Sequence, residues 1–334
     1  MKKVVSFSGG RTSAYLCHLV IEIFGRENVD FIFMDTGAEH PKTYEFIRKV
    51  NDEFGLDLVC LRGDFSLPLG AGVRYHVVDI NDIGPDLKPY KEMMEKYGVP
   101  YTGGMFCTDR MKLKPFKKYS DDTYGKGNYE TWLGIRFDEP KRLVGDNPKY
   151  PLKSAYKQLI KAGLSDEEIS LLYTNSRKYI NEINQWKISS LSKELLIKRI
   201  SYLDKENLHY LAEICELEKK DILDHWSRMP FDLELDEWSG NCEFCPKKSN
   251  LKLAASRIDS PLSYVKFVDA LHDDSVRVDD KTGHWSKMYR GNQSLEMLIA
   301  TFDGSTGTEI KARMRGAKHL DAGSCSESCE VFNN

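Results

Sequence analysis

Two sets of residues in this chain have types and spacings that suit chemistry: a turn rich in glycine and hydroxyl groups, and a set of cysteines. The turn follows a β-prone run and precedes a helix-prone one, and it reads Ser8-Gly9-Gly10-Arg11-Thr12-Ser13. Free N–H groups and the helix dipole attract an anion at such a position, and glycines let the backbone approach phosphate oxygens. The turn therefore predicts a phosphate or pyrophosphate site. The alternative is a turn that only connects two elements.

Five of the eight cysteines stand in contexts that favour metal or redox chemistry. Cys242 and Cys245 form a C-x-x-C segment, whose two thiolates can face one metal ion, form a redox pair or bind an iron–sulfur cluster. Cys107 precedes the basic residues of segment 110–118, whose positive charge favours a thiolate. The isolated Cys17, Cys60 and Cys215 are interpreted as small buried hydrophobic residues.

The last two cysteines lie near the end of the chain. Cys325 and Cys329 are spaced i, i+4, but the surrounding glycine and serine favour a loop over a helix. Three interpretations stay open: a fourth metal ligand, a thiol delivered to the site, or an inert terminus.

The elements that must position these residues alternate between strand and helix. Such alternation predicts an α/β fold: a doubly wound, mostly parallel sheet with helices on both faces. The expected strands are residues 2–7, 29–34, 56–61 and 131–135, and the expected helices are residues 12–24 and 42–54.

A change in pattern divides the chain into three expected parts. Residues 1–150 form the nucleotide-binding α/β core, residues 151–225 a basic helical insert, and residues 226–334 a cysteine-bearing C-terminal region with a flexible tail. Within residues 141–200, 12 Lys or Arg stand against 6 Asp or Glu. This excess suits either a solvated helical face or a nucleic-acid contact surface.

Length and composition exclude several classes of protein. At 334 residues the chain is long enough for about two domains, and its balanced composition excludes collagenous and largely disordered proteins. The net charge of −3 excludes a global polycation. The absence of a long apolar run and of a secretory N-terminus predicts a soluble, cytoplasmic protein.

Four segments in a fixed order resemble the phosphoadenosine phosphosulfate (PAPS) reductase family. They are the phosphate turn, Met34–Thr43, Phe106–Phe116 and Gly134–Glu139, and Asn241–Pro246 extends the resemblance. This family belongs to the adenine-nucleotide α-hydrolase-like (PP-loop) superfamily, which includes ATP pyrophosphatases and sulfur-inserting enzymes of tRNA and DNA phosphorothioation. The resemblance implies a Rossmann-like fold and a bound adenine nucleotide, ATP or a relative of it.

The resemblance also implies the roles of individual residues. The turn and Arg136 would bind the phosphates, and the adenine would lie beside strand 29–34. The candidate catalytic residues are Arg136, Cys107 and Asp35. The implied nucleotide-binding set is Ser8, Gly9, Gly10, Arg11, Thr12, Ser13, Phe33, Met34, Asp35, Thr36, Gly134 and Arg136.

Superfamily members that hold an iron–sulfur cluster carry cysteines at corresponding places. The resemblance therefore implies a [4Fe-4S] cluster bound by Cys107, Cys242 and Cys245. Structural zinc is the alternative. Two departures from the family pattern matter. Thr12 replaces the Asp of ATP pyrophosphatases, which leaves Mg²⁺ binding open, and the Glu-Cys-Gly-Leu-His segment of assimilatory PAPS reductases does not occur.

Three functions follow as hypotheses. The first is an enzyme that adenylylates its substrate with ATP and then lets sulfur displace the adenylate, with nucleic acid as a suitable substrate and with sulfur-donor or companion proteins as partners. The second is a reductase that forms sulfite from adenylyl sulfate or PAPS. The third is a nucleotide-binding regulatory subunit without turnover.

Overall fold

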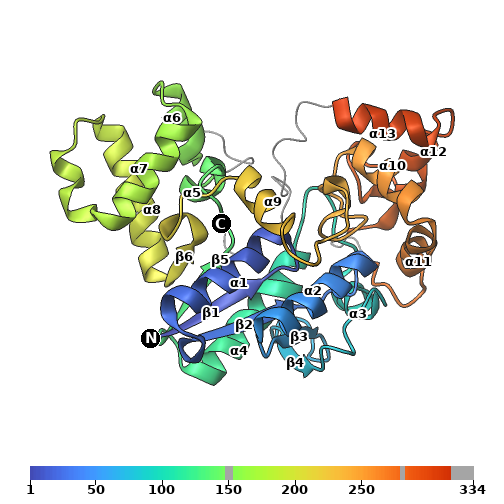
Figure 1. The fold of residues 1–334 in the computed structure, drawn as a ribbon. Coiled ribbons are helices and arrows are strands. Elements are labelled where there is room, and N and C mark those ends of the chain that lie inside the picture. The colour runs from blue at the N-terminus through green and yellow to red at the C-terminus, as the bar shows by residue number, and fades with distance from the viewer. Residues whose placement is uncertain (147–152, 279–282, 317–334) are drawn as a thin grey trace.

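A six-stranded sheet forms the centre of the chain, as Figure 1 shows. The computed structural model describes residues 1–146, 153–278 and 283–316. The strand order is β4-β3-β2-β1-β5-β6, and every neighbouring pair is parallel except β3 and β4. The strands are β1 (Lys2–Phe7), β2 (Val29–Met34), β3 (Val59–Asp64), β4 (Arg74–Val78), β5 (Tyr129–Leu133) and β6 (Leu208–Tyr210). The predicted α/β class with a mostly parallel sheet is confirmed.

Side chains of the central strands alternate between two hydrophobic layers. Val5, Phe7 and Phe33 pack with α1 (Arg11–Phe24) and α2 (Pro41–Phe54) on one face, whereas Val4 and Met34 pack with α4 (Lys114–Tyr124) on the other. Both faces of β1 and β2 are therefore buried, which is why these strands read as nearly continuous apolar runs.

The expected strands and helices lie close to the observed ones, although the strand expected at residues 131–135 runs from Tyr129 to Leu133 and the short strand β6 was not expected. The third strand begins at Val59 instead of residue 56, because Leu56 is buried in the core just after α2 ends. The edge strand β4 was not expected. Its side chains are mostly exposed, so its sequence lacks the apolar run that marks a buried strand.

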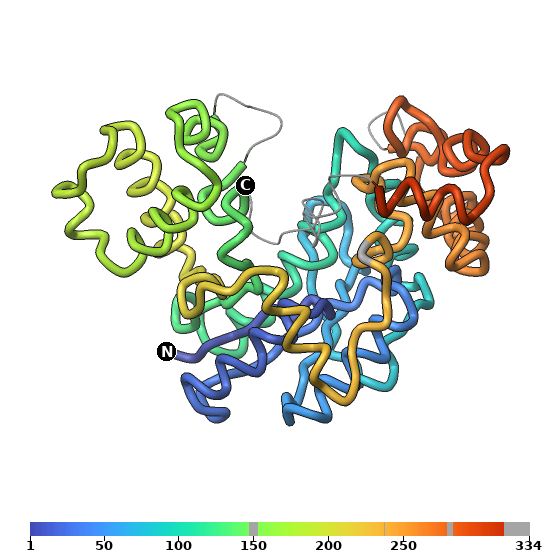
Figure 2. The backbone as a smooth tube through the Cα atoms, turned by 45° about the horizontal axis from the view of Figure 1, so that its top comes forward, coloured from blue at the N-terminus to red at the C-terminus, as the bar shows by residue number. Residues whose placement is uncertain are grey.

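Two helical lobes lie on either side of the sheet's upper edge in Figures 1 and 2. The first belongs to the crossover from β5 to β6 and has its own hydrophobic cluster. Its helices are α5 (Pro140–Val144), α6 (Ala155–Lys161), α7 (Asp166–Lys178) and α8 (Ser190–Lys205). The second follows the C-x-x-C segment and packs against α3 (Lys88–Tyr97). Its helices are α10 (Asn250–Asp259), α11 (Pro261–Leu271), α12 (Leu295–Ala300) and α13 (Gly307–Gly316).

One further helix, α9 (Lys219–Trp226), lies between the lobes and packs against α1. Ile222 and Trp226 of this helix are buried in the same core layer as α1 and α2. The end of the predicted insert 151–225 thus contacts the sheet's own helices. In the described residues, no helix is long and apolar enough to span a membrane.

The chain changes direction in the sheet beside β1. It runs from β1 through β2 to β3 on one side and returns to β5 on the other side of β1. Ligands of open α/β sheets bind at such a switch point, outside the carboxyl ends of the strands. Here the two loops touch: a Cβ on Gly134, after β5, would lie 3.0 Å from the Ser13 backbone nitrogen and 3.0 Å from its Cα.

This close approach gives a test of stability. We expect Gly134→Ala to lower the free energy of unfolding by about 1–3 kcal/mol, since the new methyl group meets backbone that must shift. Urea denaturation measures the loss. Gly84→Ala is the matched control, because nothing lies within 4 Å of its added Cβ. Equal stability of the two variants would contradict the close contact between the loops.

Candidate functional site

The turn between β1 and α1 has the form of an anion site. Gly9 has a φ of 77°, and a Cβ there would lie 2.9 Å from side-chain atoms of both Thr43 and Ile47. The Ser13 hydroxyl accepts the Ser8 N–H at 3.2 Å and donates to the Gly10 carbonyl at 2.9 Å. The first backbone bond of α1 runs from Ala14, so the N–H groups of residues 11–13 precede the helical ladder. These N–H groups are available to an anion.

Arg136 reaches this turn from the other side of the switch point. Its side chain is 4% exposed, and its Nη1 donates to the Thr12 hydroxyl at 3.1 Å. Asp138 fixes the fork by accepting from Nε at 2.7 Å and from Nη2 at 3.3 Å. The structure thus brings together Thr12, Gly134 and Arg136, three of the residues predicted to bind nucleotide.

Glu139 completes the support of Arg136. Its carboxylate accepts the Arg136 backbone N–H at 2.9 Å and the guanidinium of Arg142 at 2.5 Å. Burial raises the pKa of Glu139, but the positive charges of Arg142 and Arg136 outweigh burial, and the pKa is lowered overall. The carboxylate therefore stays ionised and balances part of the arginine charge.

The other arginine of the turn is engaged elsewhere. Arg11 Nε and Nη2 donate to the two carboxylate oxygens of Asp232 at 2.6 and 2.8 Å, and Nη2 also donates to the Leu233 carbonyl. Its guanidinium thus contacts a distant segment of the chain, although Arg11 belongs to the predicted phosphate-binding set.

The predicted adenine neighbours are core residues in this structure. Phe33 is 1% exposed and packs beside Phe7 and Tyr44, and Met34 is 4% exposed on the opposite face of the sheet. Their side chains are therefore occupied by packing, so adenine would have to meet this strand end through the backbone. Their role beside the adenine stays a prediction.

Asp35 is completely buried, with both carboxylate oxygens in use. Oδ1 accepts the Gly37 N–H and the Tyr44 hydroxyl, both at 2.9 Å, and Oδ2 accepts from Arg62 at 2.7 Å. Burial, and secondly the nearby Glu39 charge, raise the pKa of Asp35 to about 6 against the opposing effect of Arg62. Asp35 orders this turn, and its predicted catalytic role stays a prediction.

Glu39 is a central residue that the sequence analysis did not select. It is 2% exposed and accepts from Thr36 Oγ1 at 2.6 Å and from Lys112 Nζ at 3.2 Å, and it shares the single hydroxyl hydrogen of Tyr44 with Asp35, at 3.0 Å from that hydroxyl. Lys112 lies in a π-helix, Thr108–Leu113, a rare form that is frequent at functional sites. The available signal was a carboxylate inside the Met34–Thr43 segment.

The same turn holds the cysteine-bearing segment. Glu39 and Cys242 form an isolated antiparallel bridge, and the Glu243 N–H donates to the Ala38 carbonyl at 3.0 Å. The Cys242 sulfur lies 3.8 Å from Thr36 Oγ1 and 4.0 Å from Glu39 Oε1. The C-x-x-C segment is therefore attached directly to the end of β2.

The three predicted metal ligands gather in one buried hydrophobic cluster. The exposed fraction of each thiol residue, Cys107, Cys242 and Cys245, is at most 8%. All three lie close enough to Tyr90 to affect it: burial of Tyr90 is the main cause of its raised pKa, and the three thiols raise that pKa further. The donor chemistry and shared location suit a thiolate-bound metal. Yet no three Cys, His, Asp or Glu side chains of the described chain are arranged to hold a metal ion. Cys325 and Cys329 lie outside the described residues.

The burial of Asp35 predicts a pH dependence of stability. Its pKa is about 6 in the folded chain against 3.8 for an ordinary Asp, so the folded chain binds more protons between these values. Stability from this group therefore falls as pH rises from about 4 to 6, by about 3 kcal/mol in total. Asp35→Asn removes this dependence.

The measurement is urea denaturation of both proteins across that pH range. We expect the difference in unfolding free energy, wild type minus Asp35→Asn, to decrease steadily from pH 4 to pH 6. Other titrating groups cancel in this difference. A difference that stays constant across the range would show that the carboxyl group titrates normally.

Comparisons with known proteins match the first part of the chain to a family model and nearly the whole chain to a phage protein. The model of the phosphoadenosine phosphosulfate reductase domain matches residues 2–66, which contain the phosphate turn and the Asp35 turn. The uncharacterized nin region protein ORF290 of Escherichia phage lambda is 38% identical over 336 residues, which cover 99% of this chain and 96% of that protein.

Two archaeal proteins match shorter segments. The uncharacterized proteins MJ0066 and MJ0973 of Methanocaldococcus jannaschii are 26% and 29% identical over 133 and 114 residues, or 22% and 21% of their own lengths. No solved structure matches the chain. Since the likeness to the phage protein extends over the whole length, the chain belongs to the same family as that protein, and its residues 2–66, which hold the turns after β1 and β2, match the phosphoadenosine phosphosulfate reductase domain.

Proposed function

We propose that the chain binds the phosphates of ATP in the turn 8–13 and uses ATP to adenylylate an oxygen of its substrate. The substrate oxygen attacks the α-phosphorus, the bond to the β-phosphate oxygen breaks, and pyrophosphate leaves. A sulfide-class donor then displaces AMP, so that sulfur replaces the activated oxygen. The observation that carries the proposal is the contact of Arg136 with Thr12 beside the N–H groups of α1.

The charge arrangement suits the first of these steps. The N–H groups of residues 11–13 and the Arg136 guanidinium lie at the same turn, and negative charge would accumulate on the leaving pyrophosphate as the bond breaks. Arg136 is held at Nε and Nη2 by Asp138, so its fork needs no reorganisation when a phosphate arrives. Mg²⁺ would add positive charge at the same phosphates. Thr12 does not supply the carboxylate that ATP pyrophosphatases place there.

The attachment of Cys242 to the Glu39 turn supports the sulfur step. The phosphate turn follows β1, and the turn of residues 35–40, which holds both Asp35 and Glu39, follows β2. These two strands are direct neighbours in the sheet. A sulfur atom held near Cys242 would therefore lie at the same edge of the sheet as the nucleotide. Lys112, whose ammonium group contacts Glu39, places positive charge at that position.

We also propose that Cys107, Cys242 and Cys245 bind an iron–sulfur cluster, which would supply an iron site for sulfur or a route for electrons. Zinc is the alternative. The proposal rests on the three thiols sharing one buried cluster. Because the described residues do not form a completed ligand group, no step of the proposed reaction is assigned to the cluster.

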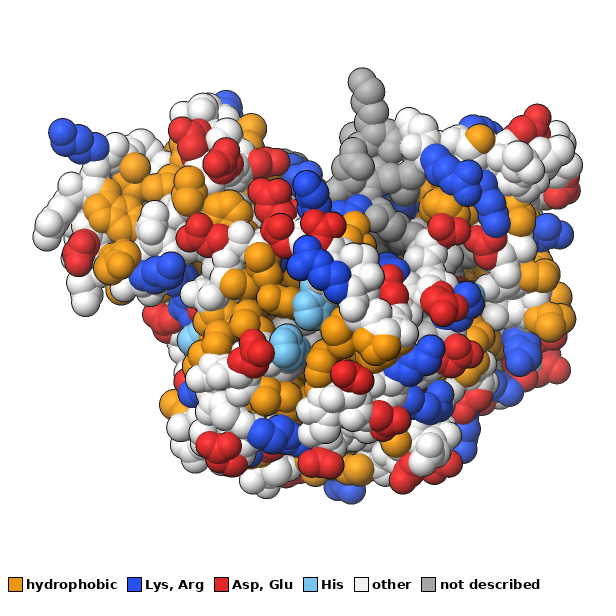
Figure 3. Space-filling view, viewed as in Figure 1, with side chains coloured by type: hydrophobic (Ala, Val, Ile, Leu, Met, Phe, Trp, Pro, Cys, Tyr) orange, Lys and Arg blue, Asp and Glu red, His pale blue; other side chains and the backbone are white. Residues whose placement is uncertain are grey.

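Nucleic acid is the acceptor that we propose, on the basis of the basic lobe α5–α8. Lys153, Lys157 and Lys161 are exposed there, whereas Arg177 and Arg199 are used for internal contacts. In the view of Figure 3, acidic and basic side chains are mixed over this lobe. This surface would therefore contact nucleic-acid phosphates through separate lysines. Whether nucleic acid is the acceptor is tested by its effect on the rate of pyrophosphate release.

The first experiment measures pyrophosphate release from ATP, with and without tRNA or duplex DNA. We expect release by the wild type, stimulation by the acceptor, and at least a hundredfold loss in Arg136→Gln, since one oxyanion-stabilising donor contributes on the order of 10²–10³ to rate. Arg74→Gln, at an exposed arginine on the edge strand β4, is the control.

The alternatives give different outcomes in the same experiment. Sulfite formed from PAPS, without pyrophosphate from ATP, would identify a reductase. Nucleotide binding with neither product would identify a regulatory subunit. Either result contradicts the adenylylation proposal.

The second experiment tests the metal. We expect about four irons and four acid-labile sulfides per chain after anaerobic purification, in keeping with a [4Fe-4S] cluster, and their loss in Cys242→Ala. Cys215→Ala is the matched control, because Cys215 is half-buried among residues that pack on α1 and α2, away from the thiol cluster. Stoichiometric zinc, or iron retained in Cys242→Ala, would contradict the cluster.

A further inference from the structure

The segment 217–235, here called the strap, contacts both arms of the phosphate site. At its beginning, the Leu217 carbonyl accepts the Phe137 N–H at 3.3 Å, and the Lys219 N–H donates to Asp138 at 3.1 Å. At its other end, Trp226 Nε1 donates to the Arg11 carbonyl at 3.0 Å, and Asp232 holds the Arg11 guanidinium. The strap therefore joins the Arg136 loop to the phosphate turn.

The pair of Arg11 and Asp232 differs from the other ion pair of the site. Arg136 is 4% exposed, whereas the side chains of Arg11 and Asp232 are 19% and 36% exposed. Access to solvent weakens such a pair relative to a buried one and lets it exchange partners, although its bidentate geometry strengthens it. Its arginine is also the first residue of α1, next to the N–H groups that precede the helical ladder.

We propose that Asp232 is an internal competitor of the bound polyphosphate: its carboxylate holds Arg11 until phosphate oxygens take its place, which loosens residues 227–235 of the strap. The inference rests on the proposed nucleotide site and deepens it by adding a regulatory contact. A carboxylate and a phosphate offer the same two-oxygen partner to a guanidinium fork, and the phosphate carries more charge.

Geometry favours exchange of the guanidinium over loss of the whole strap. Trp226 is completely buried and packs against Phe46, with ring centroids 4.9 Å apart, which anchors the end of α9. The loosened part thus begins after Trp226. A movement of Arg11 toward phosphate would free Asp232 and the Leu233 carbonyl together, because both accept from this one side chain.

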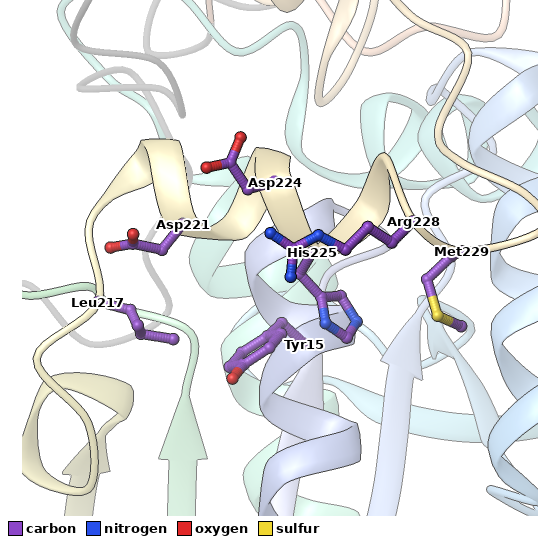
Figure 4. A pocket seen from close by; sticks show the side chains of 7 residues that line it. All are labelled: Tyr15, Leu217, Asp221, Asp224, His225, Arg228 and Met229. Atoms are coloured by element: carbon purple, nitrogen blue, oxygen red, sulfur yellow. The ribbon is translucent and has the colours of Figure 1, made fainter.

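The packing of the strap leaves room for such a change. A surface hollow of about 470 Å³ lies between α9 and α1, as Figure 4 shows. His225 points from α9 toward Tyr15, with ring centroids 4.8 Å apart, while Asp224 points away. The hollow borders Arg228 and Met229, among the first residues of the part that loosens, whereas Phe231 and Leu233 further along pack on the core of α1 and α2 and limit the shift to a local one.

The test compares the affinities of ATP, inorganic pyrophosphate and adenosine by calorimetry. We expect Asp232→Asn to bind ATP and pyrophosphate about two- to fivefold more tightly than the wild type. This factor is the ratio of dissociation constants that corresponds to the free energy of an exposed ion pair. Adenosine binding stays unchanged, since it carries no phosphate. In an Arg11→Gln background, Asp232→Asn has no effect.

Glu234→Gln is the matched control. Glu234 lies two positions beyond Asp232 in the strap and pairs with Lys42 at 3.3 Å. Its substitution therefore removes a negative charge from the strap without removing a partner of Arg11. We expect unchanged affinities. Amide hydrogen exchange gives a second measurement: pyrophosphate should accelerate exchange in residues 227–235 of the wild type.

The outcomes separate the inference from the proposed function. Wild-type binding of ATP with equal or weaker binding by Asp232→Asn, or slower exchange of the strap on binding, would overturn the competition alone. Tighter binding that Arg11→Gln does not abolish would do the same. Failure of every variant to bind ATP and pyrophosphate would overturn the nucleotide site, and the competition with it.

Discussion

The contact between Arg136 and the phosphate turn is the interaction on which the candidate site depends. It needs the loops after β1 and β5 to meet, which they do because β5 pairs directly with β1 and because Gly134 has no side chain to hold them apart. Arg136 then lies almost without solvent beside Thr12. A buried guanidinium must be fully paired, and Asp138 and Glu139 provide that pairing within three residues of chain.

A second buried charge group connects this site to the cysteines. Asp35 and Glu39 are two carboxylates on one short turn, and Arg62 and Lys112 oppose them from β3 and the π-helix. Each charge alone would be costly in the core, so the four side chains stabilise one another only when β2, β3 and the π-helix are all in place. The C-x-x-C segment bonds to this same turn, so its position depends on the complete network.

The sequence allowed the fold to be predicted where burial alone determines the pattern. The first two strands are predicted to the residue because both of their faces are covered, whereas the edge strand β4 left no such signal. The phosphate turn and Arg136 were found from local motifs. The orientation of Phe33 follows from strand alternation, which places successive side chains on opposite faces.

Other parts of the site could not be read from the chain. Asp232 lies 221 residues from Arg11, and nothing near either residue indicates the pair. The contact of Glu39 with Lys112 needs a π-helix, which local periodicity does not reveal. Such contacts depend on tertiary structure, because they join segments whose own sequences are compatible with many partners.

The two arginines of the site illustrate how burial divides their roles. Arg136 is held by neighbours on its own loop, so its charge is available in a fixed direction whether or not a nucleotide is present. Arg11 has its carboxylate partner on a distant segment and keeps partial access to solvent. Rearranging Arg136 would leave Asp138 without its guanidinium partner and remove one of the two positive charges beside the buried Glu139, whereas rearranging Arg11 releases only a partly exposed carboxylate and one carbonyl. A fixed charge suits binding and an exchangeable one suits communication, which is the division of roles that we propose for Arg136 and Arg11.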